Sequence, residues 1–500
     1  MKRSREMTLQ QLLPDLALPP EVGQLRISGI ENDSRRIQGG DLFLACRGLN
    51  VDGNRFAEAA VAAGAVAVLT EDDGALVSLS VPVIRVEHLT DRQGELADRF
   101  YGSPSRKLHM VGITGTNGKT SCSHFIAAAL ERFGQRAAVI GTTGNGFLGS
   151  LEPATHTTPD AVQLQRLLAQ LQQQQAGAVA MEVSSHALEQ GRVSAVAFEQ
   201  AVFTNLSRDH LDYHGSMEAY GEAKARLLLQ YPIRHAVVNS DDPFGRALIK
   251  RIPAGVEVLA YGEQPLDQDL QSRALQLQVS QCRLNRRGIE AQIDTPWGVV
   301  GIDSPLLGRF NLDNLLASLG VLIGAGIDIQ TAVTALNQIE GVEGRMQAFD
   351  QPNQPLVVVD YAHTPDALDK ALSSLREHVQ GRLWCVFGCG GDRDRGKRPQ
   401  MAKAAEQQAD YLVVTSDNPR TEDPQAIIDE VMSGVQRSAS VRTEVNRPAA
   451  IAQAIAAAGP EDVILIAGKG HEDYQEINGV RHRYSDIETV TQILGGTDAQ

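Results

Sequence analysis

Residues 108–129 read LHMVGITGTNGKTSCSHFIAAA, and the rest of the chain is organised around this stretch. An apolar run up to Ile113 predicts a buried strand, and apolar residues at helical spacing after Lys119 predict a helix. Between them lies the glycine turn Gly115-Thr116-Asn117-Gly118-Lys119-Thr120. This order indicates a loop that binds nucleotide phosphates through backbone N–H groups and Lys119, with the Thr120 hydroxyl suited to Mg²⁺.

One position departs from the general pattern of such loops. The pattern has glycine at position 113, where this chain has Ile113. The motif alone therefore leaves a second interpretation open, in which the glycines only form a turn between a strand and a helix.

The overall composition narrows the class of protein. Five hundred residues suggest about three domains of roughly 150 residues each. Aromatic residues are few, at 5%, while aliphatic ones are abundant, as in α/β enzymes with buried parallel sheets. The net charge of −15, with no basic tract, argues against a nucleic-acid partner. Since no apolar run has the length of a signal peptide or membrane span, we expect a cytoplasmic protein without membrane contact.

The five cysteines are scattered along the chain and do not suggest a disulfide framework. Cys385 and Cys389 lie in one apolar run that ends in glycine. We therefore expect buried thiols there rather than a metal site.

The pattern of strands and helices predicts an α/β fold of three domains. Residues 1–102 alternate short apolar strands with one alanine-rich helix, which indicates a small N-terminal α/β domain. Residues 103–345 repeat strand–helix units, which predicts a central P-loop ATPase domain with a mostly parallel sheet and an antiparallel excursion near residues 255–305. Residues 346–500 begin a second α/β pattern, which predicts a Rossmann-like C-terminal domain.

Polar clusters follow the apolar strands of both larger domains. In open α/β sheets, ligands bind just beyond the carboxyl ends of the strands. The clusters include residues 182–186, 205–214, 360–363, 388–393, 416–420 and 468–472. We therefore expect one ligand-binding edge in the central domain and another in the C-terminal domain.

Four polar residues of the central domain have more than one interpretation. Glu182 closes a strand and could either ligate Mg²⁺ or cap a helix. His210 and His214 are four residues apart, but no third ligand is spaced for zinc, so we take His210 as a candidate Mg²⁺ ligand and His214 as a surface or packing residue. For Lys224, composition alone favours a solvated lysine on a helix.

Two arginines stand directly after strand-ending polar turns. Arg393 and Arg420 are each placed for bidentate recognition of a carboxylate or a phosphate. In an otherwise acidic protein, such local cations are needed for any anionic ligand.

The motifs match those of a known family in order and over nearly the whole chain. They are residues 115–120, 181–186, 204–205, 209–214, 223–224, 311 with 314, 344–345 and 360–363. The set resembles the Mur ligases, the ATP-dependent amide-forming enzymes of bacterial cell-wall precursor synthesis, including the isoleucine at position 113. Asp417-Asn418-Pro419-Arg420 and the glycine-rich tracts around Arg393 and Gly468 resemble the members that add 2,6-diaminopimelate.

The resemblance implies a role for each of these positions. The ATP site would comprise Gly115, Thr116, Asn117, Gly118, Lys119, Thr120, Asn314, Arg345, Asp360 and His363. The catalytic residues would be Lys119, Glu182, His210 and Lys224. The Mg²⁺ ligands would be Thr120, Glu182, His210 and a carbamylated Lys224, which reverses the interpretation from composition.

Two further sets of residues would bind the substrates. UDP-N-acetylmuramoyl-L-alanyl-D-glutamate would contact Ser34, Leu49, Asn50, Thr157, Thr158, Ser184, Gln190 and Arg192. Meso-2,6-diaminopimelate would contact Arg393, Asp417, Asn418, Pro419, Arg420, Gly468 and Glu472. The expected product is a new amide bond, made by a monomer through an acyl phosphate.

Three alternatives remain open from the sequence. The first is a related ligase that adds L-lysine or glutamate, against which the motif at residues 417–420 argues. The second is folate polyglutamation by a relative with the same fold. The third is a nucleotide-binding switch without chemistry, which would not need the strand-end clusters of the C-terminal domain.

Overall fold

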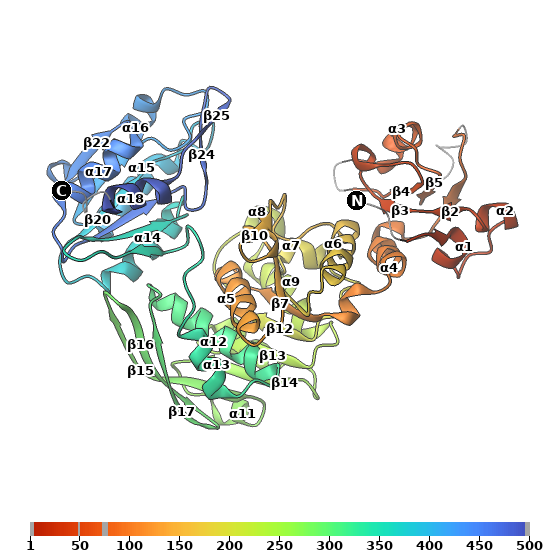
Figure 1. Cartoon of the computed structure of the whole chain (residues 1–500), viewed down its shortest axis with the longest axis horizontal. Coiled ribbons are helices and arrows are strands. Elements are labelled where there is room, and N and C mark those ends of the chain that lie inside the picture. Colours follow the sequence, from red (N-terminus) through yellow and green to blue (C-terminus); the bar gives the residue numbers. More distant parts are fainter. Residues whose placement is uncertain (1–4, 49–50, 73–78, 496–500) are drawn as a thin grey trace. The chain divides into compact units, whose positions relative to one another are not determined.

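The structure is a computed structural model that describes residues 5–48, 51–72 and 79–495. Its chain divides into two compact units. The first contains Met1–Ala260, Leu266–Leu275 and Gly320–Gly326, and the second contains Tyr261–Pro265, Gln276–Leu319 and Ile327–Gln500. Figure 1 gives the labels of the elements. The domain limits at residues 102 and 345 stay predictions.

The N-terminal part of the first unit is a parallel sheet in the order β3-β4-β5-β6. Its strands are β3 (Gly29–Glu31), β4 (Asp41–Ala45), β5 (Ala67–Thr70) and β6 (Val83–Arg85), next to a short antiparallel pair β1 (Met7–Thr8) and β2 (Arg26–Ile27). Its helices are α1 (Leu9–Leu12), α2 (Pro20–Gly23), α3 (Ala57–Ala62) and α4 (Leu89–Tyr101). Leu42 and Leu44 face a core with α1 and α4, while Phe43 and Ala45 face a core with α3. The expected small α/β domain is confirmed.

The central sheet of the first unit has five parallel strands in the order β8-β11-β7-β12-β13. They are β7 (His109–Thr114), β8 (Ala137–Gly141), β11 (Ala178–Glu182), β12 (Gln200–Phe203) and β13 (His235–Asn239), with an edge hairpin β9 (Gly144–Phe147) and β10 (Ser150–Glu152). Since β11 and β12 flank β7, the loops after these three strands lie side by side.

Six helices accompany the central sheet. They are α5 (Lys119–Arg132), α6 (Ala161–Gln173), α7 (Ser185–Glu189), α8 (Leu211–His214), α9 (Met217–Leu229) and α10 (Pro243–Ile249). Asp160 caps α6 by accepting hydrogen bonds from two backbone N–H groups of its first turn. The strands and helices thus fall where the apolar periodicity predicts them.

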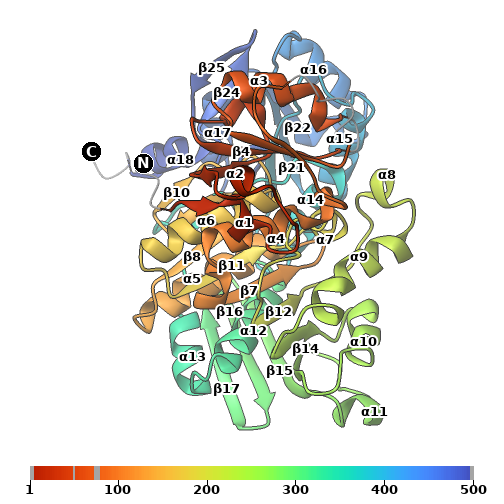
Figure 2. The same cartoon turned by 90° about the vertical axis from the view of Figure 1, so that its right-hand side faces the viewer.

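The second unit begins with the expected antiparallel excursion. Its strands are β15 (Leu275–Asn285), β16 (Gly288–Thr295) and β17 (Gly298–Ser304), which pair in sequence order. Helix α13 (Ile329–Leu336) packs against β17, as Figure 2 shows. Three further elements lie at or near the limits of the units: β14 (Glu257–Gly262), α11 (Gln268–Gln271) and α12 (Arg309–Gly324).

The C-terminal sheet of the second unit has the order β18-β19-β23-β20-β21-β22, with β18 antiparallel and the others parallel. Its strands are β18 (Gln347–Phe349), β19 (Leu356–Asp360), β20 (Leu383–Phe387), β21 (Tyr411–Thr415), β22 (Val441–Glu444) and β23 (Val463–Ala467). A hairpin of β24 (Tyr474–Ile477) and β25 (Val480–Arg483) follows.

Successive side chains of these strands enter two different cores. Val358, Cys385 and Leu465 pack with α14 (Pro365–Arg376), α15 (Lys397–Gln408) and α16 (Pro424–Met432). Val359 and Val386 pack with α17 (Arg447–Ala457) and α18 (Asp486–Gly495). Helices on both faces of a mostly parallel sheet confirm the predicted Rossmann-like architecture.

Cys385 and Cys389 are buried free thiols, as expected. Burial raises the pKa of Cys389 to about 12, so this thiol stays protonated at neutral pH. Within the described part of the chain, none of the helices combines the length and apolar character required to cross a bilayer.

Candidate active site

The glycine turn after β7 has the geometry of a phosphate-binding loop. Gly115 has φ +144°, and a Cβ there would lie 1.9 Å from Thr204 Oγ1, so only glycine fits. The Lys119 ammonium donates to the carbonyl oxygens of Gly115 and Thr116, both at 2.8 Å. Asn205 fixes the loop from the end of β12, because its Oδ1 accepts from the Asn117 N–H at 3.0 Å. Loop and cation therefore form one preorganised unit at the start of α5.

The Glu182 carboxylate lies beside this loop, at the end of β11. The Thr120 hydroxyl donates to Glu182 Oε1 at 3.0 Å, and the Thr142 N–H donates to the same oxygen at 2.8 Å. The interpretation of Glu182 as a helix cap is wrong, because the Ser184 side chain caps α7. The carboxylate and the Thr120 hydroxyl are thus brought together as the expected ligand pair.

Lys224 is buried, with 2% of its surface exposed, so the solvated lysine favoured by composition is wrong. Its ammonium donates to the Gly115 carbonyl at 2.8 Å and lies 4.4 Å from the centre of the Tyr220 ring. Burial lowers the pKa of Lys224 well below its usual value, and the positive charge of Lys119 lowers it further. A lower pKa increases the fraction of the neutral amine, which is the form that reacts with carbon dioxide.

The two histidines after β12 differ in their surroundings. His214 is packed, with 1% of its side chain exposed, and it contacts Ser185 Oγ at 2.9 Å and Glu189 at 3.0 Å. Of the two possibilities for His214, packing is therefore correct and surface exposure is wrong. His210 is half exposed, and its ring centre lies 6.1 Å from that of Tyr220, the residue whose ring faces Lys224.

These side chains fit a magnesium ion bound together with phosphate. Mg²⁺ prefers oxygen ligands, usually one or two carboxylates with substrate phosphates and water. Thr120 and Glu182 supply oxygen here, and a carbamate on Lys224 would supply more. Among the described residues, no three His, Cys, Asp or Glu side chains gather closely enough to hold a metal by themselves. The set thus suits an ion that completes its coordination with phosphate oxygens.

A substitution at Gly141 tests the placement of Glu182. A Cβ at position 141 would lie 2.2 Å from Glu182 Oε1, so Gly141→Ala must displace the buried carboxylate. We expect kcat to fall about tenfold or more, together with a higher Mg²⁺ requirement, because an oxygen ligand moves. Magnesium titrations of the steady-state rate measure both. Gly301→Ala is the matched control, since a Cβ there meets nothing within 4 Å. Unchanged magnesium dependence in Gly141→Ala would contradict the assignment.

The residues expected to bind the sugar-peptide form a continuous network next to Glu182. The Thr158 hydroxyl donates to the Glu182 carbonyl at 2.8 Å and accepts from the Ser184 N–H at 3.1 Å. The Arg192 guanidinium donates to the Thr158 carbonyl at 3.0 Å and to Gln190 Oε1 at 2.6 Å. Thr157 joins through Thr142, with 3.1 Å between the hydroxyl oxygens. The structure therefore brings together five of the eight predicted positions.

The other three positions belong to the N-terminal part of the chain. Ser34 begins a short 3₁₀ helix that Asp33 caps. In that helix, Arg36 lies 3.9 Å from Asp160, the residue that caps α6. Leu49 and Asn50 lie outside the described residues.

The remaining ATP residues belong to the second unit. Asp360 accepts hydrogen bonds from the N–H groups of Met346 and Ala362, both at 2.8 Å, and burial raises its pKa. Arg345 lies 4.8 Å over the Tyr361 ring, and its buried Nε has no hydrogen-bond partner among the described residues. His363 is exposed. Asn314 is buried on α12 and donates to Asn311 at 3.0 Å. Lys119 belongs to the first unit, and these four residues belong to the second.

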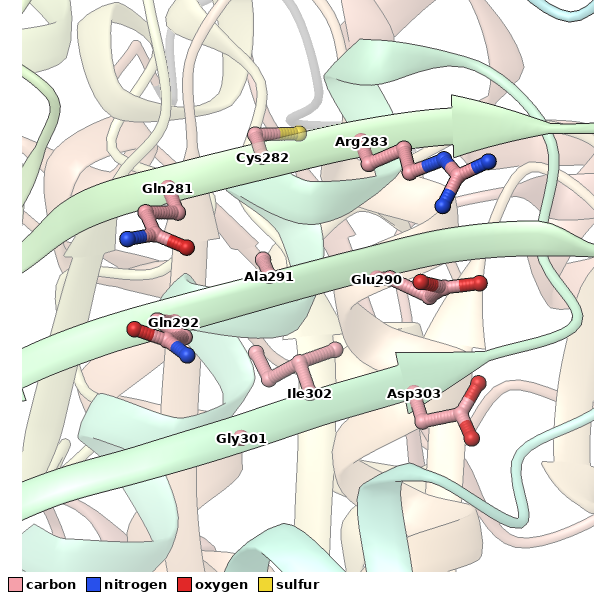
Figure 3. Close-up of a pocket in the computed structure, with 9 residues that line it drawn as sticks. All are labelled: Gln281, Cys282, Arg283, Glu290, Ala291, Gln292, Gly301, Ile302 and Asp303. Carbon is pink, nitrogen blue, oxygen red and sulfur yellow. The ribbon is translucent and has the colours of Figure 1, made fainter.

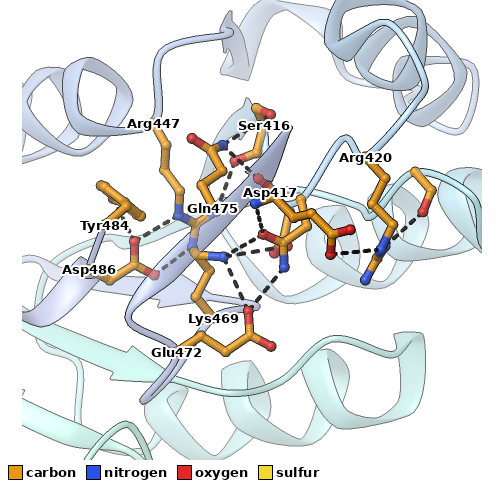
Figure 4. Close-up of polar contacts among 12 residues, drawn as sticks. Ser416, Asp417, Arg420, Arg447, Lys469, Glu472, Gln475, Tyr484 and Asp486 are labelled. Carbon is orange, nitrogen blue, oxygen red and sulfur yellow. Dashed lines mark hydrogen bonds and ion pairs between the residues drawn. The ribbon is translucent and has the colours of Figure 1, made fainter. Parts of the chain in front are cut away.

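A second polar cluster forms at the ends of β21 and β23 (Figure 4). Asn418 Nδ2 donates to Glu472 Oε2 at 3.0 Å, and a Cβ at Gly468 would lie 2.7 Å from Asp417 Oδ2. The Arg420 guanidinium donates to the Gly391 carbonyl at 2.7 Å and lies 3.6 Å from Glu476. Pro419 is buried between Asn418 and Arg420, whereas Arg393 is exposed. Six of the seven predicted diaminopimelate residues thus lie in or directly beside this cluster.

Sequence reasoning missed the hairpin that covers this cluster. Gln475 donates to the Asp417 carbonyl at 2.6 Å, and the Glu476 N–H donates to Asn418 Oδ1 at 2.9 Å. The signal for the hairpin is the pair Asn478-Gly479, since Asn-Gly is the preferred two-residue turn and both residues have positive φ.

A hollow of about 440 Å³ lies on the β15–β17 sheet of the second unit (Figure 3). Its lining residues are Gln281, Cys282, Arg283, Glu290, Ala291, Gln292, Gly301, Ile302 and Asp303. None of them belongs to a predicted site.

Three family models match successive parts of the chain. They are described as the Mur ligase family catalytic domain at residues 26–101, the Mur ligase middle domain at 113–322 and the Mur ligase glutamate ligase domain at 344–470. Together the three matches span most of the chain.

Curated relatives match over nearly their full lengths. A protein of Ectopseudomonas mendocina is 49% identical over 99% of both chains, and one of Pseudomonas aeruginosa is 50% identical over 98% of both. A protein of Chromobacterium violaceum is 50% identical over 96% of both chains. All three are named UDP-N-acetylmuramoyl-L-alanyl-D-glutamate–2,6-diaminopimelate ligase.

Solved structures show the same architecture. A structure with the same ligase name has a TM-score of 0.75 and 38% identity, over 99% of this chain and all of that one. The MurF ligase of Thermotoga maritima, solved with ADP, has a TM-score of 0.60 at 19% identity, over 94% of this chain and 97% of that one. The second likeness supports the fold alone.

Proposed function

The chain belongs to the Mur ligase family, and from this premise we propose that it adds meso-2,6-diaminopimelate to UDP-N-acetylmuramoyl-L-alanyl-D-glutamate at the expense of ATP. The reaction supplies a precursor of peptidoglycan. The cluster at the ends of β21 and β23 carries the choice of amino acid, because Arg420 belongs to the same loop after β21 as Asp417 and Asn418, and Asn418 donates to Glu472.

The first step makes the substrate carboxylate reactive. The D-glutamyl γ-carboxylate attacks the γ-phosphorus of ATP, which gives an acyl phosphate and ADP. The Lys119 ammonium stabilises the charge on the phosphoryl oxygens, and the backbone N–H groups of the first turn of α5 hold the phosphates. Bound Mg²⁺ would neutralise phosphate charge, and Thr120, Glu182, His210 and carbamylated Lys224 would hold it.

The second step forms the amide bond. The neutral amine of diaminopimelate attacks the acyl carbon, the bond from that carbon to the phosphate oxygen breaks, and the nitrogen loses one proton as inorganic phosphate leaves. The network of Thr157, Thr158, Ser184, Gln190 and Arg192 orients the sugar-peptide for this attack. Ser34, Leu49 and Asn50 would bind its UDP end.

The far end of meso-diaminopimelate carries an ammonium and a second carboxylate, and lysine lacks that carboxylate. Arg420 offers a fixed guanidinium for the carboxylate, and Asp417 and Glu472 offer oxygens for the ammonium. Gly468 allows the close approach of Asp417, and Arg393 is a further cation for the substrate carboxylates. The nucleotide would also contact Asn314, Arg345, Asp360 and His363.

Replacement of Arg420 by alanine should remove the amino-acid preference. In wild type, the charge-assisted pair between Arg420 and the far carboxylate of diaminopimelate is worth about 1.5–3 kcal/mol. With lysine bound, this pair is absent and Arg420 faces the lysine ammonium, so both effects exclude lysine. Wild type should prefer meso-diaminopimelate over lysine by about 10⁴-fold or more in kcat/KM. Arg420→Ala should lose most of this ratio by losing diaminopimelate activity, and Lys370→Ala, an exposed lysine of α14, is the control. If Arg420→Ala keeps full selectivity, another cation selects the substrate, with Arg393 next to test.

We place the enzyme in the cytoplasm, where ATP is supplied. We further propose that it acts as a monomer, because one chain carries all of the predicted contact residues.

A further inference from the structure

Lys469 is a fully buried lysine at the centre of the amino-acid cluster. Its ammonium donates to Asn418 Oδ1 at 3.1 Å and to Glu472 Oε2 at 3.2 Å, and it lies 3.9 Å from Asp417 Oδ1 (Figure 4). An ammonium has three protons, and three acceptors from the two strand-end segments surround it. Buried charges are stable only when they are paired in this way.

The backbone around Lys469 accounts for its inward position. Gly468 has φ +116° and Gly470 has φ +52°. A Cβ at either glycine would approach within 2.7 Å of another atom, Asp417 Oδ2 in one case and the Gly344 carbonyl oxygen in the other. Lys469 is therefore the one side chain in a tight Gly-Lys-Gly turn that runs directly past Asp417.

We propose that Lys469 is a positioning residue for the amino-acid site, which orients Asp417, Asn418 and Glu472 toward the far ammonium of diaminopimelate. This inference rests on the proposed function and deepens it. Lys469 acts indirectly, because its ammonium contacts these three neighbours and not the reacting atoms.

The orientation of the Asn418 amide shows how Lys469 acts. Asn418 Oδ1 accepts from Lys469 and from the Glu476 N–H, so this end of the amide must be the oxygen. Asn418 Nδ2 then points to Glu472 Oε2, at 3.0 Å. Lys469 thus fixes the amide, and ammonium and amide together fix the Glu472 carboxylate.

The test is steady-state kinetics of wild type, Lys469→Met, Glu472→Gln and the double variant. Lys469→Met should raise KM for meso-diaminopimelate about tenfold or more, while KM for ATP stays within about twofold. In the Glu472→Gln background, the same replacement should have a smaller effect, because part of its effect passes through Glu472. Lys370→Met is the control.

Thermal unfolding separates this role from a general loss of structure. If Lys469→Met does not fold, the double variant still decides, because it removes one charge of each sign and is compared with Glu472→Gln. Equal KM values for diaminopimelate in the double variant and in Glu472→Gln support the positioning role. A KM that is about tenfold higher in the double variant overturns it. Unchanged KM in a folded Lys469→Met also overturns it. If wild type shows no turnover that depends on diaminopimelate, the proposed function itself fails.

Discussion

Lys119→Ala should fold normally and lose turnover almost completely. The ammonium donates to two carbonyl oxygens of its own loop, and each such bond contributes about 1 kcal/mol, so unfolding temperatures should change little. The rate should fall about 10³-fold or more, because Lys119 is the one positively charged side chain of the Gly115–Thr120 loop. ADP formation and thermal unfolding are the two measurements.

Lys370→Ala is the control for Lys119→Ala, since Lys370 is an exposed lysine paired with Asp366 on α14. It should match wild type in both measurements. A Lys119→Ala protein that makes product at nearly the wild-type rate would show that the loop does not bind the phosphates of ATP.

Replacement of Lys224 should reduce turnover almost as much as Lys119→Ala does. The pKa of Lys224 is lowered well below its usual value, so the amine is neutral over more of the physiological range and can take up carbon dioxide. The carbamate would turn a cation into an oxygen ligand for Mg²⁺. Lys224→Ala should lose about 10³-fold or more in kcat, and small carboxylic acids should restore part of it by filling the vacated position.

Lys224→Arg separates a carbamate from a required positive charge. A guanidinium cannot carry the carboxyl group, so this variant should be inactive as well. The carbamate itself should appear as a carbon-13 signal in protein supplied with labelled bicarbonate, and this signal should be absent in both variants. Full activity of Lys224→Arg would mean that only a cation is needed there, and the carbamate proposal would be wrong.

Much of the architecture could be predicted because parallel sheets leave a strong pattern in the sequence. Strands buried on both faces appear as short apolar runs, and polar residues directly after them mark the ligand edge. The loop before α5, the carboxylate of Glu182 at the end of β11 and the polar cluster around Asp417 all follow from this signal.

Features set by distant contacts could not be predicted. Lys224 looks like a surface residue because its partner, the Gly115 carbonyl, is 109 positions away in the sequence. The buried pair of Arg447 and Asp486 likewise depends on the packing of α17 against α18. The donation from Arg447 to the Ala467 carbonyl at 2.9 Å depends on the packing of α17 against β23. Such charged residues have no local pattern, since their burial depends on a partner that the fold supplies.

The most direct test of the central claim is the dependence of phosphate release on the amine. Purified protein, ATP and Mg²⁺ are mixed with UDP-N-acetylmuramoyl-L-alanyl-D-glutamate and with meso-diaminopimelate, L-lysine or L-glutamate in turn, and inorganic phosphate is measured with time. The proposal predicts rapid release with diaminopimelate, slow release with the other amines, and little release when the UDP-linked dipeptide is omitted. Equal release with lysine and diaminopimelate, or release that does not need the UDP-linked dipeptide, would contradict it.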